Sequence, residues 1–469
     1  MKVKFITLGC KTNIYETNAM EQQFLKNGFD VLKKDNSLAD NLDIDENEKP
    51  DIVVVNTCSV TNVAERKSRQ MIRRAKEFNQ NAIVVVCGCY SQVAKDEIEK
   101  LPEVDLIIGI NEKNKIVEIV NEYLKSKNKI SEVSDVMHDN EFLDFGTTTY
   151  TELTRAVIKV QDGCDRFCSY CIIPYARGKV RSRKPESILN EIREISKKGI
   201  QEVVLTGIHV ASYGKDFTNE EVEKYRKEYG YTGEYKKFDP KDDLATGGFR
   251  LIELLEQINK IETIKGIRLG SIEPKLITKE FIDRLKNLDK VCEHFHLSLQ
   301  SGCDETLKRM NRRYTTEEFE ESAKMLREAF PTVNLTTDII VGFPGETDEE
   351  FSKTYEYLKK IKFYKMHIFK YSPRRGTKAE VMPNQVDGKI KEERSKKLIE
   401  LSDKNEKEYN EKYLGKTLKV LFEERDGEYF KGHTRNYLYV KVKTDEDLEN
   451  KICDVKITKL NGLEIIGEL

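Results

Sequence analysis

The stretch VQDGCDRFCSYCIIPYARG, Val160–Gly178, places Cys164, Cys168 and Cys171 at a C-x3-C-x2-C spacing. Three thiols so close together indicate a metal or redox site, because ten cysteines among 469 residues are too sparse for a disulfide-stapled secreted scaffold. A closed structural zinc site needs four ligands, and the next Cys or His along the chain after the triplet, His209, lies on a different predicted strand. Three thiolates fit a four-iron cluster better, since one iron then keeps a position for a small molecule.

Six β-then-α units surround this triplet between residues 146 and 400, and they predict a partial (β/α)6 barrel that is open on one side. The predicted strands are AVIKVQDG, QEVVLTGI, GIRLGSIEP, FHLSLQSG, VNLTTDIIVGFP and KMHIFKYS. The triplet follows the first strand, at the predicted C-terminal mouth of the barrel, where βα loops gather active-site groups. A Lys/Glu/Tyr-rich insertion, at about 213–248, interrupts the pattern and is expected to form a loop on the rim.

Residues 1–145 alternate apolar strands with amphipathic helices and predict an open parallel α/β sheet. Cys10, Cys58 and Cys89 follow the strands KVKFITLG, DIVVVNT and NAIVVVCG. The carboxyl ends of parallel strands share one edge, so we expect these thiols to converge on a second cluster. Burial in the core explains any one of them equally well, and only their joint placement favours a site. The acidic stretch Asp35–Asp51 is expected to be an exposed loop.

The C-terminal residues 413–469 alternate apolar and polar side chains with period two after a highly charged predicted helix, and they predict a small all-β barrel. Such barrels often hold single-stranded nucleic acid on aromatic and basic side chains. The candidates here are Lys431, His433, Arg435, Tyr437 and Tyr439. Acidic residues slightly outnumber basic ones in this segment, so a barrel that serves only for packing is the alternative.

The overall composition favours a cytoplasmic protein without a membrane segment. The apolar run at the lysine-containing N-terminus is too short for a signal peptide, and the other apolar runs have the length of strands. The net charge is only −2 although 35% of the residues are charged, so any nucleic-acid site must be a local patch.

The triplet and the six-unit barrel together resemble the radical S-adenosylmethionine enzymes. The resemblance implies that Cys164, Cys168 and Cys171 hold a 4Fe-4S cluster whose vacant iron binds S-adenosyl-L-methionine, and that an electron from the cluster cleaves this cofactor to a 5′-deoxyadenosyl radical. Strand ends offer the expected cofactor contacts, at Gly207, Ser271, Glu273, Gln300, Gly342 and Gly345. A tight turn explains the glycines of GFPGE equally well.

Two three-cysteine sites and a terminal barrel resemble the methylthiotransferases, which carry two 4Fe-4S clusters. The motifs are GCKTN, NTCSVT, GCYSQ, PYARGKVRSR and QSGCDETLKRMNRRYT, and the resemblance covers essentially the whole chain. It assigns the second cluster to Cys10, Cys58 and Cys89, and makes residues 413–469 a TRAM-like barrel. It implies that one S-adenosylmethionine methylates a sulfur on this auxiliary cluster, and that a second generates the radical.

Within this family, LGCKTNIYET (Leu8–Thr17) looks most like the branch that converts N6-threonylcarbamoyladenosine at position 37 of tRNA, 3′ of the anticodon, to its 2-methylthio derivative. The isopentenyladenosine branch typically has a Gln-Met pair after the first cysteine, and the ribosomal-protein aspartate branch a Pro-Lys pair. Either of these acceptors, with the same chemistry, is an alternative. A zinc-containing RNA-binding protein without catalysis is the alternative from a different class.

Basic residues near the predicted sites are candidates for contact with RNA phosphates. They are Arg177, Arg181 and Arg183 after the triplet, Lys431 and Arg435 on the barrel, and Arg66, Lys67, Arg69, Arg73 and Arg74 on one predicted helix, where a solvated face is the alternative. Some of these arginines suit the threonylcarbamoyl carboxylate instead. The resemblance also implies an electron donor such as flavodoxin or ferredoxin, and we expect a monomer.

Overall fold

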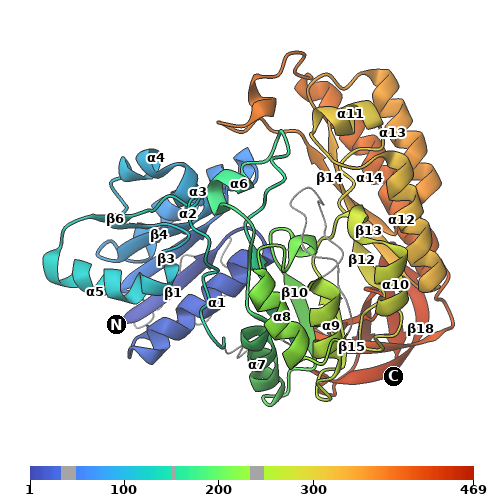
Figure 1. Ribbon diagram of the computed structural model, residues 1–469, viewed down its shortest axis with the longest axis horizontal. Coiled ribbons are helices and arrows are strands. Elements are labelled where there is room, and N and C mark those ends of the chain that lie inside the picture. Colours follow the sequence, from blue (N-terminus) through green and yellow to red (C-terminus); the bar gives the residue numbers. More distant parts are fainter. Residues whose placement is uncertain (33–48, 149–153, 233–247) are drawn as a thin grey trace.

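The structure is a computed structural model, and it describes residues 1–32, 49–148, 154–232 and 248–469 (Figure 1). A parallel sheet with its helices lies at the left of the view, a second set of parallel strands and helices fills the centre and right, and a small barrel lies at the lower right. This is the α/β fold with a strand-rich C-terminal part that the sequence predicts. None of the helices in the described ranges has the length and apolar character that crossing a bilayer requires.

The N-terminal part is a six-stranded parallel sheet in the order β2-β1-β3-β4-β5-β6, covered by helices on both faces. Its strands are β1 Lys2–Thr7, β2 Asp30–Val31, β3 Ile52–Thr57, β4 Ile83–Gly88, β5 Leu106–Ile108 and β6 Ile130–Glu132. Helices α1 (Lys11–Lys26) and α5 (Ile116–Ser126) pack on one face and α2 (Asn62–Phe78) on the other. Every residue of β3 and β4 is buried, which explains their unbroken Val/Ile runs. The acidic stretch 35–51 lies largely outside the described residues.

Six parallel strands form the central partial barrel. They are β7 Arg155–Lys159, β10 Glu202–Thr206, β11 Gly266–Leu269, β12 His294–His296, β13 Asn334–Val341 and β14 Lys365–Lys370. Continuous backbone hydrogen bonding joins them as two three-stranded sheets, and single bridges such as Ile272 to Leu297 connect β11 with β12. Among the described strands, β14 does not pair with β7, so the barrel stays open there. All six strands coincide with predicted ones.

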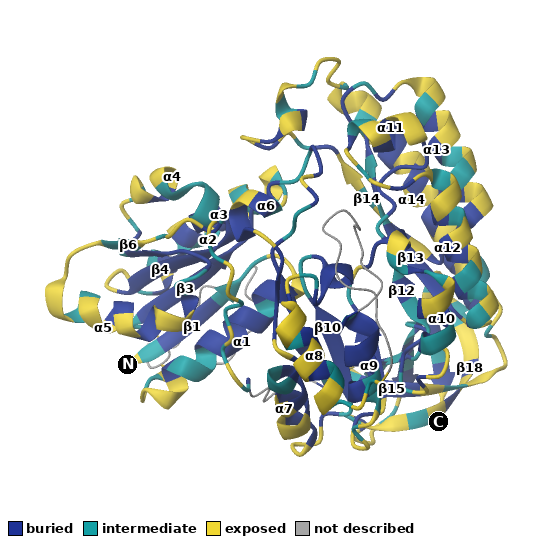
Figure 2. Ribbon diagram, viewed as in Figure 1, coloured by how far each residue is buried: buried dark blue, intermediate teal, exposed yellow. Residues whose placement is uncertain are grey.

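An outer layer of helices covers the barrel, and Figure 2 shows these helices exposed on their outer sides around buried strands. They are α7 Pro185–Ser196, α9 Leu251–Asn259, α10 Lys279–Leu285, α12 Thr316–Ala329, α13 Asp348–Ile361 and α14 Gly388–Glu411. The predicted charged helix is α14, which covers β14 with Leu398 and Leu401 buried. Arg155 of β7 and Arg268 of β11 both form ion pairs with Glu202 of β10.

The insertion at 213–248 is not the continuous loop that its composition suggested. Residues Asn219–Glu228 form helix α8, which begins at a capping box between Thr218 and Glu221. Tyr225 of this helix is buried against Phe249, with ring centroids 5.6 Å apart. The Thr-x-x-Glu pattern is typical of a helix start, and the interpretation, which rested on composition, did not use it. Residues 233–247 lie outside the described part of the chain.

The C-terminal part is a closed five-stranded barrel in the order β15-β16-β17-β19-β18. Its strands are β15 Thr417–Asp426, β16 Tyr429–Thr434, β17 Tyr439–Lys443, β18 Ile452–Asn461 and β19 Glu464–Glu468. This barrel packs against the amino ends of the central strands, where Arg268 donates to the carbonyl oxygens of Thr434 (2.8 Å) and Arg435 (3.1 Å). The guanidinium of Arg435 in turn donates to Asp289 (2.6 Å) and Val291 (2.9 Å) carbonyl oxygens.

Replacing Arg268 is expected to weaken this junction. Arg268→Met removes the 2.6 Å contact with Glu202 and both donors to the barrel, so we expect the urea midpoint to fall by an amount equivalent to about 3 kcal/mol. Lys419→Met is the control, since its ion pair with Asp454 is exposed and is expected to contribute less than about 1 kcal/mol. Unfolding of both variants is followed by circular dichroism. Similar urea midpoints for the two variants would contradict the assignment of Arg268 to this junction.

Candidate cluster and cofactor site

The three N-terminal cysteines converge at the carboxyl edge of the parallel sheet. Cys10 caps the start of α1, Cys58 follows β3, and Cys89 begins the short helix α3 (Cys89–Val93) directly after β4. The thiols are close enough for Cys10 and Cys89 each to affect the pKa of Cys58. The sequence-based expectation that these side chains meet is therefore realised, although their binding of a cluster remains a proposal.

Gly9 allows the loop of Cys10 to approach Cys58. Its φ of +103° is in the region that favours glycine, and a methyl group there would lie 2.9 Å from both Cβ and Sγ of Cys58. This close approach explains why a glycine precedes Cys10 in the first motif. The glycine brings the two cysteine loops into contact.

The chemistry of the three thiols fits a cationic metal cluster. Burial, reinforced by the neighbouring Cys89, raises the pKa of Cys58 to about 11, and burial also raises the pKa of Cys89. Thiolates at such positions need a cation, which bound iron supplies. In the part of the chain that the structure describes, no three His, Cys, Asp or Glu side chains group closely enough for one metal ion. A four-iron cluster does not require that grouping, because its cysteines bind different irons.

The second set, Cys164, Cys168 and Cys171, lies in the loop after β7 and β8 (Gln161–Asp162), at the mouth of the barrel. Burial, opposed by a backbone hydrogen bond and reinforced by Cys168, raises the pKa of Cys164 to about 12. Burial and the two other thiols also raise the pKa of Cys171. The three sulfurs therefore form one site on one loop.

The segment 309–312 holds this cysteine loop in place. The backbone N–H of Ser169 donates to the carbonyl oxygen of Met310 (3.0 Å), and its hydroxyl donates to that of Arg309 (2.7 Å). The side-chain amide of Asn311 donates to the carbonyl oxygen of Phe167 at 3.0 Å. The motif QSGCDETLKRMNRRYT, whose role the sequence left open, thus includes the support for the cluster loop.

Arg312 connects the loop to a buried carboxylate. Its guanidinium lies 3.3 Å from Cys168 Sγ and 3.3 Å from Glu273 Oε1. Glu273 Oε2 also meets Arg166 at 2.6 Å and His209 at 3.2 Å. Burial would raise the pKa of Glu273, but His209, Arg312 and Arg166 together hold it below its ordinary value. The sequence placed Glu273 at this site but missed Arg312, for which no spacing signal existed.

The other predicted cofactor contacts occupy the carboxyl ends of the barrel strands. Ser271 is exposed after β11, Gly207 follows β10, and Gln300 has a φ of +72°, a strained value for a residue with a side chain. Gly342 and Gly345 form a tight turn, in which the Glu346 carboxylate accepts the N–H of Gly342 at 2.9 Å. Contact of these residues with a cofactor remains a prediction.

Three predicted RNA contacts are buried and cannot reach RNA in this conformation. Arg177, Arg181 and Arg183 are each at most 1% exposed. Arg181 pairs with Asp139 at 3.4 Å, and Arg183 pairs with Asp144 at 3.0 Å and with Glu191. Carboxylates of the protein itself therefore take the place that the interpretation gave to phosphates.

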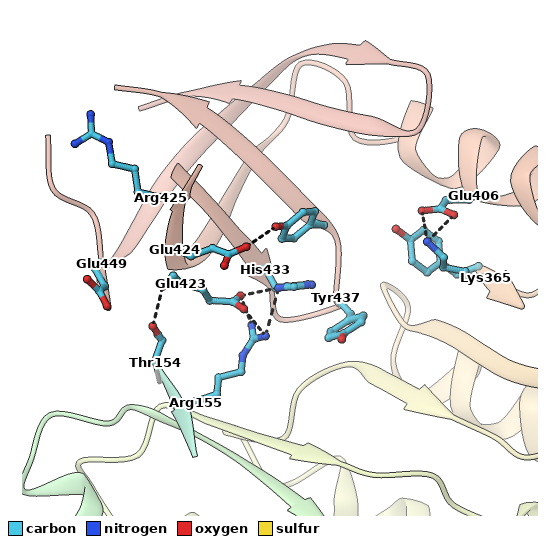
Figure 3. A pocket seen from close by; sticks show the side chains of 12 residues that line it. Thr154, Arg155, Lys365, Glu406, Glu423, Glu424, Arg425, His433, Tyr437 and Glu449 are labelled. Carbon is cyan, nitrogen blue, oxygen red and sulfur yellow. Dashed lines mark hydrogen bonds and ion pairs between the residues drawn. The ribbon is translucent and has the colours of Figure 1, made fainter. Parts of the chain in front are cut away.

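The terminal barrel also offers its candidates less freely than expected. Lys431 is paired with Asp426, and Arg435 is committed to docking. His433, Tyr437 and Tyr439 line a cavity of about 690 Å³ between the barrel and the central part, as Figure 3 shows for the first two. Four glutamates (Glu406, Glu423, Glu424 and Glu449) and three basic residues (Arg155, Lys365 and Arg425) also line the cavity, so it offers phosphate no excess of positive charge.

Comparison with known proteins adds independent findings. Residues 158–358 match the Radical SAM superfamily, and residues 2–109 match Uncharacterized protein family UPF0004. The chain is 38% identical to threonylcarbamoyladenosine tRNA methylthiotransferase MtaB of Bacillus subtilis (strain 168), over 97% of this chain and 94% of the relative. It is 33% identical to tRNA-2-methylthio-N(6)-dimethylallyladenosine synthase of Caldicellulosiruptor saccharolyticus, over 99% and 91% of the two chains.

Among solved structures, the radical S-adenosylmethionine methyltransferase TsrM from Kitasatospora setae matches with a TM-score of 0.51. The match has 15% identity and covers 81% of this chain and 77% of that chain. At this level of identity it supports the fold alone.

Iron analysis tests the two cysteine sets separately. We expect about eight irons per chain in anaerobically reconstituted protein, and about four in either the Cys164/Cys168/Cys171→Ala or the Cys10/Cys58/Cys89→Ala variant. Cys453→Ala, in the terminal barrel, is the control and is expected to keep about eight. A fall from about four irons to none in the first variant would leave the N-terminal thiols without a cluster.

Proposed function

The chain belongs to the radical S-adenosylmethionine methylthiotransferases, and we propose that it converts N6-threonylcarbamoyladenosine at position 37 of tRNA to its 2-methylthio derivative. The supporting observation is near-full-length similarity, which is higher to the threonylcarbamoyladenosine enzyme (38%) than to the dimethylallyladenosine enzyme (33%). The motif GCKTN, without the Gln-Met or Pro-Lys pair of the other branches, points the same way.

The family implies a 4Fe-4S cluster and S-adenosylmethionine, and we assign this cluster to Cys164, Cys168 and Cys171. We further propose a second 4Fe-4S cluster on the N-terminal cysteines. When bound, these groups supply a carbon-centred radical and a methylthio group. Activation of an aromatic C–H bond by a radical requires no general acid or base. The chain's own residues therefore act by holding the clusters, the cofactor and the adenosine in register.

The partners follow as part of the same proposal. We propose that tRNA contacts the exposed Arg66, Lys67 and Arg73 of α2, because the arginines after the triplet are buried. Flavodoxin or ferredoxin is the proposed electron donor, and the proposed functional unit is a monomer. Residues 1–145, 146–400 and 413–469 are the proposed auxiliary-cluster, radical and TRAM-like domains.

The threonylcarbamoyl group differs from the isopentenyl group by carrying a carboxylate, so its site needs a cation. Lys11 is exposed, begins α1 directly after Cys10, and makes no hydrogen bond or ion pair with the residues in the described ranges. We propose that the ammonium group of Lys11 receives the carboxylate.

Modified nucleosides from cells decide the substrate. Deletion of the gene is expected to remove 2-methylthio-threonylcarbamoyladenosine from tRNA digests, leaving threonylcarbamoyladenosine in its place. Plasmid-borne wild type should restore the product, whereas a Cys89→Ala variant should not. Persistence of the product, with loss of 2-methylthio-isopentenyladenosine instead, would assign the chain to the other acceptor.

Substitution of Lys11 tests recognition of the carboxylate. Lys11→Gln is expected to lower kcat/KM on threonylcarbamoylated tRNA by about tenfold or more, since a charge-assisted hydrogen bond contributes roughly 1.5–3 kcal/mol. Lys26→Gln, at the exposed end of the same helix, is the control. Cleavage of S-adenosylmethionine without tRNA should not change. An equal loss in that cleavage would show that Lys11 supports the cluster and not the substrate.

A further inference from the structure

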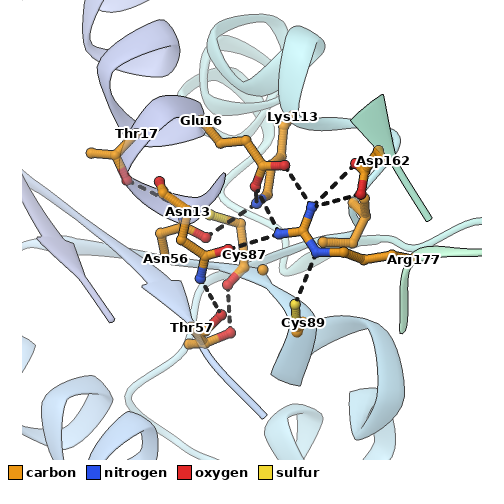
Figure 4. Close-up of polar contacts among 12 residues, drawn as sticks. Asn13, Glu16, Thr17, Asn56, Thr57, Cys87, Cys89, Lys113, Asp162 and Arg177 are labelled. Atoms are coloured by element: carbon orange, nitrogen blue, oxygen red, sulfur yellow. Dashed lines mark hydrogen bonds and ion pairs between the residues drawn. The ribbon is translucent and has the colours of Figure 1, made fainter. Parts of the chain in front are cut away.

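A buried cluster of charges joins the N-terminal sheet to the mouth of the barrel (Figure 4). Its members are at most 1% exposed and comprise Glu16 of α1, Lys113 of η2 (Lys113–Lys115), Lys159 of β7, Asp162 of β8, and Arg177 at the end of α6 (Ile173–Arg177). Two come from the N-terminal part and three from the barrel. Glu16 contacts each of the three cations, Lys113 (2.5 Å), Lys159 (2.7 Å) and Arg177 (2.7 Å).

Three cations in this cluster share two carboxylates. Glu16 contacts all three cations, and Asp162 lies 2.5 Å from Lys159 and 3.1 Å from Arg177. Both carboxylates are therefore paired with cations of the cluster. Arg181 lies 4.0 Å from Asp162 and is paired with Asp139. Arg181 and Asp139 together therefore add no net charge to the cluster. One anionic partner is missing, and buried unpaired charge is costly.

The missing partner lies at the cysteine site. Nε of Arg177 donates to Sγ of Cys89 at 3.3 Å, so a thiolate there completes the charge balance. Nη2 of Arg177 donates to Asn13 Oδ1 at 2.7 Å. The amide nitrogen of Asn13 then donates to the carbonyl oxygens of Leu8 (2.7 Å) and Thr57 (3.0 Å), which precede Cys10 and Cys58. Arg177 thus contacts one cysteine directly and fixes the loops of the other two through one amide.

The same residue lies close in sequence to the other cluster loop. Helix α6 begins two residues after Cys171 and ends at Arg177. Its Ala176 packs with Cys89 in a small apolar cluster. A five-residue helix therefore separates a predicted ligand of the radical cluster from the guanidinium that contacts a predicted ligand of the auxiliary cluster.

We propose that Arg177 is the positioning residue of the auxiliary cluster, and that it raises the cluster's reduction potential by stabilising the Cys89 thiolate. Hydrogen bonds to ligand sulfur and nearby positive charge favour the more negative, reduced state of an iron–sulfur cluster. Because Arg177 belongs to the barrel and Cys89 to the sheet, cluster stability also depends on docking of the two parts. This inference rests on the proposed second cluster.

Arg183 offers a matched comparison, because it is an arginine of the same motif and just as buried. It pairs with Glu191 and Asp144 and donates to Tyr15 Oη at 3.1 Å, but the structure gives it no contact with a sulfur atom among the described residues. Loss of Arg183 removes a buried ion pair of similar kind. It therefore reports the general cost of such a loss at this junction.

The experiment measures the auxiliary cluster alone, in protein that carries Cys164/Cys168/Cys171→Ala. Arg177→Met, Arg177→Lys and Arg183→Met are added to this parent, and each protein is reconstituted anaerobically. Iron content, the electron paramagnetic resonance spectrum and the midpoint potential are then recorded. We expect Arg177→Met to shift the potential downward and change the g values, Arg177→Lys to recover part of the shift, and Arg183→Met to match the parent.

Each outcome decides the proposal. A potential and spectrum unchanged in Arg177→Met, or changed equally in Arg183→Met, overturn the role of Arg177 while leaving the second cluster intact. A parent without iron overturns the second cluster and this inference together. If Arg177→Met fails to fold, Arg177→Lys decides, since it keeps the charge but cannot reproduce the three-way contact with Cys89, Asn13 and Glu16.

Discussion

The buried charge cluster around Glu16 is the constraint on which the arrangement of the two cysteine sites depends. Full removal of five ionised side chains from water is tolerable only when their partners are in contact, and those partners come from two separate parallel-stranded parts. A small displacement of the sheet relative to the barrel would leave several charges unpaired. The cluster therefore favours one docking geometry, and with it one position of the auxiliary cysteines relative to the barrel mouth.

The two cysteine sites are built on the same physical principle. Each contains a buried thiol with a guanidinium at 3.3 Å from its sulfur, Arg177 at Cys89 and Arg312 at Cys168. Each guanidinium is held by a buried carboxylate, Glu16 in one case and Glu273 in the other. Since thiolates are disfavoured by burial, fixed positive charge beside the sulfur prepares each site for anionic ligation.

The sequence predicted what depends on local pattern. Unbroken Val/Ile runs revealed the buried strands, and cysteines at three strand ends were expected to meet because parallel strands share an edge. The arginines of PYARGKVRSR were interpreted as RNA contacts because the carboxylates that pair with them, such as Glu16 and Asp139, lie outside the motif. Arg435 was interpreted in the same way, but its partners are backbone carbonyl groups of the central partial barrel, which no local pattern reveals. Helix α8 was missed because the segment was interpreted from its Lys/Glu/Tyr-rich composition and its capping box was not considered.

The central claim is that the buried junction holds two clusters at one fixed separation. Pulsed electron paramagnetic resonance on wild-type protein, with both clusters reduced, measures their magnetic dipolar coupling. A single narrow distribution of separations is the predicted result, because the docking geometry is set by contacts among Glu16, Asp162 and Arg177. A broad distribution, or two clusters that relax independently, would contradict the account.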